Sequence, residues 1–161
     1  MPPATIHKVT TEEEFEHLFI LIIALADFEK LSPPDESAKQ RLFHDCFCEK
    51  PRFEAYLAFT GEQPVAYAII FETYSSFLAK PTLYLEDIFV LPEYRKQKIG
   101  VTLFRYLVQL AQQRGCGRME WQVLDWNTGA IDFYKRLGAT HLKEWYSFRL
   151  NEEQIKLFPS L

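Results

Sequence analysis

Residues 83–100 read LYLEDIFVLPEYRKQKIG, and this stretch decides the fold. An apolar strand is followed by a basic turn, which leads directly into an amphipathic helix. In that order, the free N–H groups and the positive dipole end of the helix lie beside the turn, where a phosphate can bind. Two carboxylates, Glu86 and Asp87, lie upstream in the strand. The stretch therefore predicts a strand–turn–helix unit that brings a cationic substrate next to a phosphorylated cofactor.

The rest of the chain alternates strands with helices. Apolar periodicity predicts helices over 11–30, 35–48, 99–114 and 127–137, and strands over 6–9, 53–60, 65–74, 82–90, 119–124 and 142–150. Thr10 or Thr11 is expected to cap the first helix and Asp35 the second. No repeat or linker interrupts the pattern, so we expect one domain over residues 1–161. The element order predicts an α/β fold with helices flanking a mixed sheet.

Composition excludes several classes of protein. The net charge of −4 gives no support for a nucleic-acid partner. The longest apolar run, residues 18–26, is far shorter than the roughly twenty residues of a membrane span, and no secretion signal is recognisable. The odd count of three cysteines argues against a disulfide framework, and none has metal-ligand spacing with a histidine. We therefore expect a cytoplasmic protein with reduced thiols, no metal and no membrane partner.

Several motifs in register resemble one known family. Residues 95–100 occupy the register of the acetyl-CoA loop Arg/Gln-x-x-Gly-x-Gly/Ala of the GCN5-related N-acetyltransferases (GNAT). The resemblance narrows to the diamine (spermidine/spermine-type) acetyltransferases, whose motifs match residues 25–31, 84–90, 92–95, 123–127 and 133–139. The serine-containing stretch 74–77, with residues 28–31 and 124–127, looks more like the thialysine-preferring branch.

The resemblance implies a fold and a reaction. The expected GNAT fold has a mixed, mostly antiparallel central sheet flanked by helices, with splayed central strands that form the acetyl-CoA cleft. The expected reaction transfers acetyl from acetyl-CoA to a primary amine of a small molecule, by direct attack in a ternary complex. The substrate would be a thialysine- or lysine-like amine, a diamine or a polyamine, and the family is typically homodimeric. The apolar residues between Phe148 and Leu161 are ones that a partner subunit or the core could cover.

The resemblance also implies residue roles. Tyr134 matches the tyrosine that protonates the departing thiolate, and Glu86 matches the glutamate that takes the amine proton through water. Because pleating sends Glu86 and Asp87 to opposite faces, a bulge is needed if both are to enter one cleft, and the resemblance implies such a bulge at this position. The implied acetyl-CoA contacts, besides Tyr134, are Ile88, Phe89, Val90, Arg95, Lys96, Gln97, Lys98, Ile99, Gly100, Val101, Asn127 and Ala130. The implied amine-binding residues are Phe28, Glu29, Glu86, Asp87, Glu120, Trp121, Gln122 and Glu144.

The loop departs from the family pattern at two positions. Lys98 stands where the family has its central glycine, and Lys96 stands where diamine acetyltransferases also have glycine. A lysine can still offer its N–H to a phosphate if its φ is negative, and its ammonium group adds attraction. The substitution therefore either leaves CoA binding unchanged or weakens it by crowding.

Two other functions fit the same sequence. Acetylation of a peptide or protein would need an open groove, which a sequence does not reveal. A CoA-binding regulatory module with little turnover would need neither Tyr134 nor Glu86, so the presence of both argues against it.

Overall fold

The computed structural model describes residues 4–158, which form two compact units. The first unit runs to Gln122 and the second begins at Val123. Leu161, named above as a residue that a partner could cover, lies outside the described residues.

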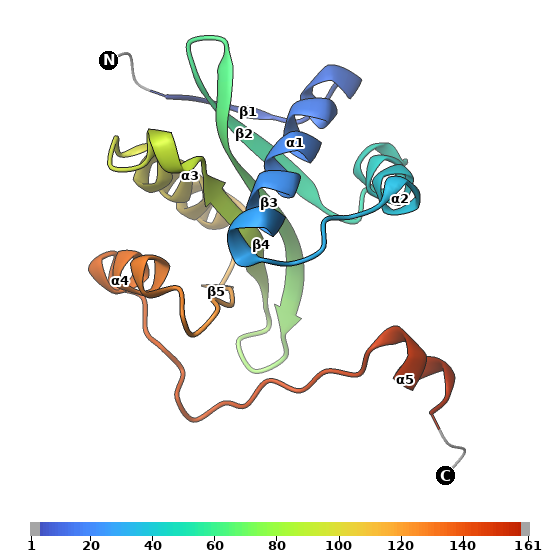
Figure 1. Cartoon of the computed structure of the whole chain (residues 1–161). Helices are drawn as coiled ribbons and strands as arrows, with labels where there is room; N and C mark the ends of the chain where they lie inside the picture. The colour runs from blue at the N-terminus through green and yellow to red at the C-terminus, as the bar shows by residue number, and fades with distance from the viewer. Residues whose placement is uncertain (1–3, 159–161) are drawn as a thin grey trace. The chain divides into compact units, whose positions relative to one another are not determined.

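The first unit is built on one mixed sheet (Figure 1). Its strands follow the order of the chain: β1 (Thr5–Lys8), β2 (Glu54–Thr60), β3 (Gln63–Ser75), β4 (Lys80–Val90) and β5 (Arg118–Glu120). The first four pair antiparallel, whereas β5 is parallel to β4. The helices are α1 (Glu12–Glu29), α2 (Glu36–Phe47) and α3 (Ile99–Gln113), with a short 3₁₀ turn, η1 (Pro92–Tyr94), before α3.

The two faces of the sheet are covered by different helices. Leu57 of β2 and Tyr67 of β3 pack with Phe15 and Leu18 of α1 in one buried cluster. On the other face, Tyr56 meets Tyr106 of α3 with ring centroids 5.4 Å apart. Burial on both faces removes apolar surface of the sheet from water, which stabilises the unit.

The predicted helix caps are confirmed. Thr11 accepts a hydrogen bond from the Glu14 N–H, and the Glu14 carboxylate accepts one from the Thr11 N–H, which makes a capping box at the start of α1. Asp35 caps α2 by accepting from the Ala38 N–H. These contacts fix where each helix begins.

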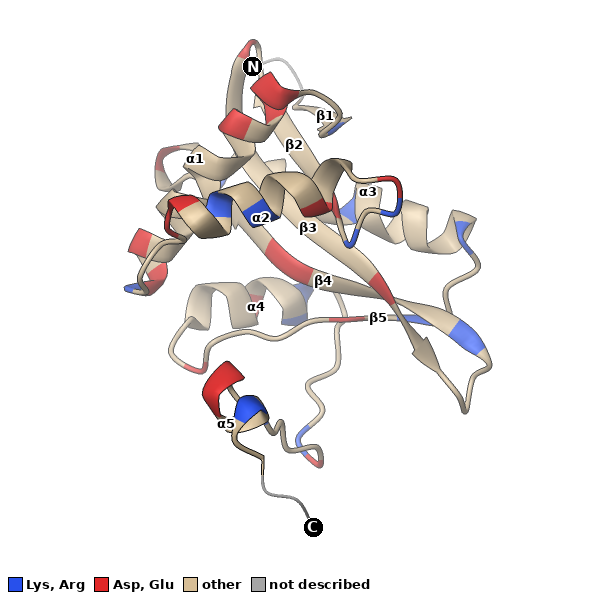
Figure 2. Ribbon diagram, turned by 90° about the vertical axis from the view of Figure 1, so that its right-hand side faces the viewer, with Lys and Arg blue, Asp and Glu red and all other residues tan. Residues whose placement is uncertain are grey.

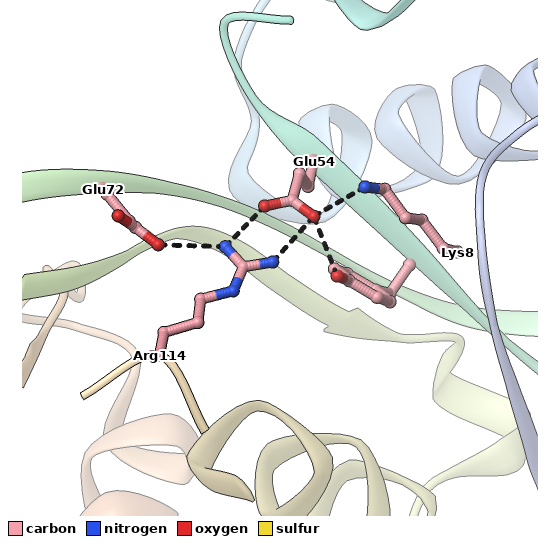
Figure 3. A network of polar contacts seen from close by, with 5 residues as sticks. Lys8, Glu54, Glu72 and Arg114 are labelled. Carbon is pink, nitrogen blue, oxygen red and sulfur yellow. Dashed lines mark hydrogen bonds and ion pairs between the residues drawn. The ribbon is translucent and has the colours of Figure 1, made fainter. Parts of the chain in front are cut away.

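A polar network holds the C-terminal end of α3 to the sheet (Figure 3). Arg114 donates to both carboxylate oxygens of Glu54, at 2.6 and 2.9 Å, and to Glu72 at 3.1 Å. Lys8 pairs with Glu54 at 2.7 Å. Burial alone would raise the pKa of Glu54, but the hydrogen bonds from Arg114 and Lys8 outweigh it and lower that pKa to about 2.

We expect Arg114→Gln to lower the free energy of unfolding at pH 7 by about 2 kcal/mol, because it leaves Glu54 half-buried without its main partner. Because the folded pKa of Glu54 lies below its unfolded value, its contribution is present above about pH 4.5 and is lost as pH falls towards 2. Urea unfolding at pH 7 and pH 3 measures both effects. Equal losses at the two pH values would contradict this assignment.

The described part of the second unit, residues 123–158, holds the helices α4 (Thr128–Arg136) and α5 (Glu152–Lys156). The prediction of a strand over 142–150 is wrong: these residues form no regular structure, and Phe148 is 94% exposed. The sequence alternation is typical of a strand, but a strand forms only where another strand accepts its hydrogen bonds. The strand predicted over 119–124 is also shorter than expected, because β5 ends at Glu120.

The described part of the chain contains no helix long and apolar enough to cross a membrane. It also shows no group of three or more His, Cys, Asp or Glu side chains arranged to hold a metal ion. All three cysteines are free thiols.

Candidate active site

A β-bulge lies at the two carboxylates of β4. Ile69 of β3 pairs with Asp87 and the next residue, Ile70, pairs with Leu85, so Glu86 is the extra residue. Cross-strand partners share a face, which places Leu85 on the face of α3 and Asp87 on the face of α1. The bulge expected from the family resemblance is therefore present at the expected place.

The bulge also changes which backbone groups face the outer edge of β4. Before it, the Pro81 carbonyl accepts from the Gly117 N–H on the side of β5. After it, the Leu91 N–H points to β3, where it donates to the Val65 carbonyl at 3.0 Å. Because backbone groups alternate along a strand, the N–H groups of Ile88 and Val90 face away from β3.

That outer edge of β4 is open over its second half. The pairing with β5 stops at Tyr84 and Glu120, whereas β4 continues to Val90, and no strand of residues 4–158 pairs with this edge beyond that point. The edge is open because β5 ends at Glu120, and it lies where the splayed strands were expected from the sequence. Exposed N–H groups at such an opening can bind the carbonyl groups of an extended ligand.

Three acidic residues, Glu29, Glu86 and Asp87, lie around the bulge. Figure 2 shows the acidic part of β4 as a red band on the ribbon. Glu86 is exposed and Asp87 is partly buried. Burial, followed by the negative charge of Glu86, raises the pKa of Asp87 to about 6, and Glu29 of α1 adds to the effect. Burial also raises the pKa of Glu29. The carboxylates thus lie close enough to act on one another and create a negative site suited to an ammonium group.

Arg95 of the basic loop contacts Phe28, the residue that precedes Glu29 in α1. The Arg95 guanidinium lies over the Phe28 ring, 4.5 Å from its centroid, and 5.6 Å from that of Phe89. Its Nε donates to the Val90 carbonyl at 3.0 Å, on the open edge of β4. Arg95, predicted as a phosphate contact, therefore also fixes the basic loop against the sheet.

The basic loop keeps the backbone of a glycine loop although it contains lysines. Lys96 has φ of 61° and Lys98 has φ of 64°, so both occupy the left-handed region that favours glycine. Lys98 therefore lacks the negative φ under which a lysine was expected to offer its N–H to a phosphate. Lys98 is the N-cap of α3 and makes no side-chain capping bond, so the first N–H groups of α3, those of Ile99, Gly100 and Val101, are directed at the loop.

Because a β-branched residue fits this conformation poorly, we expect Lys98→Val to lower the free energy of unfolding by about 1 to 2 kcal/mol. Gln97→Val is the matched control, since Gln97 lies between the two lysines without a positive φ. Urea unfolding measures the difference. Equal stability of the two variants would show that the loop relaxes to another conformation.

The second unit carries the remaining predicted cofactor contacts and the predicted acid. Asn127 caps α4 by accepting from the Ala130 N–H at 3.2 Å, and its side chain still carries an NH₂ donor. Tyr134 lies in the last turns of α4, with its ring 5.3 Å from that of Phe133. Burial raises the pKa of Tyr134 to about 12, so its phenol is protonated at neutral pH.

The other four predicted amine-binding residues have different settings. Glu120 forms an ion pair with Arg118 at 3.1 Å, and the Trp121 ring packs edge-on against Phe104 of α3. Gln122 is exposed at the end of the first unit. Glu144 lies in the irregular part of the second unit and is exposed. Of the predicted amine-binding residues, the structure brings together Phe28, Glu29, Glu86 and Asp87.

Sequence reasoning missed Tyr67. Its hydroxyl donates to the Asp87 carboxylate at 3.3 Å from the neighbouring strand. The available signal was a tyrosine within the run Val65-Ala66-Tyr67-Ala68-Ile69, because a phenol at the centre of an apolar strand needs a polar partner.

Comparison with known proteins identifies the family. Residues 19–139 match the model of the Acetyltransferase (GNAT) family. A thialysine N-epsilon-acetyltransferase of Sus scrofa is 35% identical over 156 residues, which cover 90% of this chain and 91% of that protein. A Caenorhabditis elegans protein of the same name is 31% identical over 151 residues, covering 92% of each chain.

A crystal structure of a probable acetyltransferase has the same fold. It superposes with a TM-score of 0.78 at 23% identity and covers 91% of this chain and 97% of its own. The family resemblance and the fold expected from the sequence are confirmed. With its bulged and open β4 and the basic loop before α3, the chain belongs to the GNAT acetyltransferase family and is an N-acetyltransferase.

Proposed function

We propose that this protein transfers the acetyl group of acetyl-CoA to the primary amine of a small, lysine-like molecule. The proposal rests on the three carboxylates at the β4 bulge, those of Glu29, Glu86 and Asp87. Their negative charge favours a cationic substrate. The similarity to thialysine N-epsilon-acetyltransferases over about nine-tenths of the chain supports the choice of a lysine analogue.

The residues present fit acetyl-CoA chemically. The outward N–H groups of Ile88 and Val90, with the backbone of Phe89 between them, match the amide-rich pantetheine arm. The start of α3 and the exposed Lys96 and Lys98 supply donors and positive charge for phosphates. The remaining proposed contacts are Arg95, Gln97, Ile99, Gly100, Val101, Asn127, Ala130 and Tyr134.

Acetyl-CoA, when bound, supplies a thioester whose carbonyl carbon is attacked by the amine nitrogen. Glu29, Glu86 and Asp87 attract the ammonium form of the substrate, and Glu86 accepts its proton through a water molecule. Backbone N–H groups at the open edge of β4 donate to the carbonyl oxygen, where negative charge develops. Tyr134 donates its phenolic proton to the sulfur as the C–S bond breaks.

Cys116 is poorly suited to a covalent route through cysteine. Cys116 follows the C-terminal end of α3, at the opposite end of that helix from the basic loop. Burial raises the pKa of the Cys116 thiol, which disfavours the reactive thiolate. We therefore propose direct attack in a ternary complex.

The test is release of CoA from acetyl-CoA with thialysine, lysine, spermidine and a peptide as acceptors. Acetylation of thialysine or lysine in preference to the others supports the proposal. Preference for the peptide would assign the protein to peptide acetylation. Tight CoA binding without turnover on any amine would instead indicate a regulatory module.

We also propose that the protein is a cytoplasmic homodimer in which both units belong to one domain. The family match, residues 19–139, runs across the boundary between the units. Trp145, Tyr146 and Phe148 are between 76% and 94% exposed, and a second copy would remove their apolar surface from water. Light scattering after size exclusion is expected to give twice the 19.0 kDa chain mass, and a monomer at all concentrations would contradict the dimer.

A further inference from the structure

Tyr67 is a fully buried tyrosine at the centre of β3. Its ring packs in the cluster beneath α1, 6.4 Å from the ring of Phe89. Its hydroxyl donates to Oδ2 of Asp87 at 3.3 Å. A phenylalanine would fill the same space, so packing alone does not account for the hydroxyl.

The acceptor of this hydrogen bond, Asp87, differs in its charge environment from Glu54, another partly buried carboxylate that accepts from a tyrosine. Glu54 also accepts from a tyrosine, Tyr56, at 3.1 Å, but Glu54 is neutralised by Arg114 and Lys8. Among residues 4–158, no lysine, arginine or histidine forms an ion pair with Asp87. Asp87 is therefore a partly buried carboxylate that the described chain does not neutralise, which suits a cation that comes from outside.

The groups around Asp87 come from every element that packs against it. Glu86 lies beside it on β4, Glu29 approaches from α1, and Tyr67 approaches from β3. The cation of the adjoining loop, Arg95, stacks on Phe28 and Phe89 and donates to the Val90 carbonyl. The negative charges of Glu86 and Glu29 disfavour the ionised form of Asp87, whereas the hydrogen bond from Tyr67 stabilises that form.

We propose that Tyr67 is a positioning residue of the amine site: its hydroxyl orients the Asp87 carboxylate and keeps it ionised, so that Asp87 receives the ammonium group of the substrate. This inference rests on the proposed function, because it assigns a role within the same amine site. It goes beyond that function by naming a residue on β3 that is buried beneath the site.

The inference predicts a pH-dependent effect. The Tyr67 hydrogen bond lowers the pKa of Asp87, which burial and Glu86 raise to about 6. Without the hydroxyl the pKa of Asp87 rises further, by roughly half to one unit for one hydrogen bond. The carboxylate would then be protonated over part of the range in which the wild-type site is ionised, and ammonium binding would weaken as pH falls through that range.

The experiment compares the wild-type protein with Tyr67→Phe between pH 5.5 and 8. Steady-state kinetics with thialysine and acetyl-CoA give both KM values and kcat, and thermal unfolding monitors the fold. Tyr56→Phe is the matched control, because it removes a tyrosine–carboxylate hydrogen bond on the opposite face of the sheet.

We expect Tyr67→Phe to raise the KM for thialysine roughly two- to fivefold near pH 6 and hardly at pH 8, with kcat and the KM for acetyl-CoA within about twofold of wild type. Tyr56→Phe should leave all three constants unchanged. An active wild type with unchanged KM values and pH dependence in Tyr67→Phe would overturn this inference alone. A wild type that acetylates no amine would overturn the proposed function and this inference together.

Discussion

Tyr134→Phe is expected to lower kcat about 100-fold or more, the usual size of a general acid's contribution. The phenol is suited to this role because burial raises the pKa of Tyr134 to about 12, which keeps the proton in place at neutral pH. Phenylalanine keeps the ring and its packing against Phe133 while removing the proton that the departing sulfur needs. The loss should therefore appear in kcat with little change in thermal stability.

Stopped-assay measurement of CoA release at saturating acetyl-CoA and thialysine gives this kcat directly. Tyr106→Phe is the matched control, since Tyr106 packs against Tyr56 beneath the sheet and is expected to keep full activity. A loss of less than about threefold in Tyr134→Phe would assign proton donation to water or to another residue.

Local signals predicted most of the first unit from the sequence. The capping box at Thr11 and the Asp35 cap are interactions between residues three apart, so sequence spacing reveals them. The strands predicted over 53–60 and 65–74 are separated by only a few residues, and they pair with each other as β2 and β3. The bulge at Glu86 was expected only through the family resemblance, since no local pattern distinguishes it from regular pleating.

The sequence was less informative where structure depends on distant partners. Residues 142–150 alternate like a strand, but their conformation depends on whether another strand is available to pair with them. Tyr67 was missed because its role arises from Asp87, which lies twenty residues away on the next strand. The left-handed conformation of Lys96 and Lys98 was also unexpected. This conformation is strained for lysine, and it persists only because the surrounding loop holds the backbone in place.

Glu86→Gln is expected to lower kcat/KM for thialysine about 100-fold at pH 7, because glutamine cannot accept the proton that the amine must lose. Glu86 is the residue inserted by the bulge and is exposed, so water can reach it, whereas Asp87 is held by Tyr67. Glu86 is therefore suited to transfer a proton, and Asp87 is suited to bind the ammonium group.

The pH dependence distinguishes this role from simple charge attraction. As pH rises towards the pKa of the amine, a growing share of the substrate arrives already deprotonated, so the defect of Glu86→Gln should shrink. The control Glu93→Gln removes an exposed carboxylate in η1 and should show wild-type kinetics throughout. A defect that stays constant from pH 7 to 9.5 would mean that Glu86 binds the amine without accepting its proton, and water alone would then remove that proton.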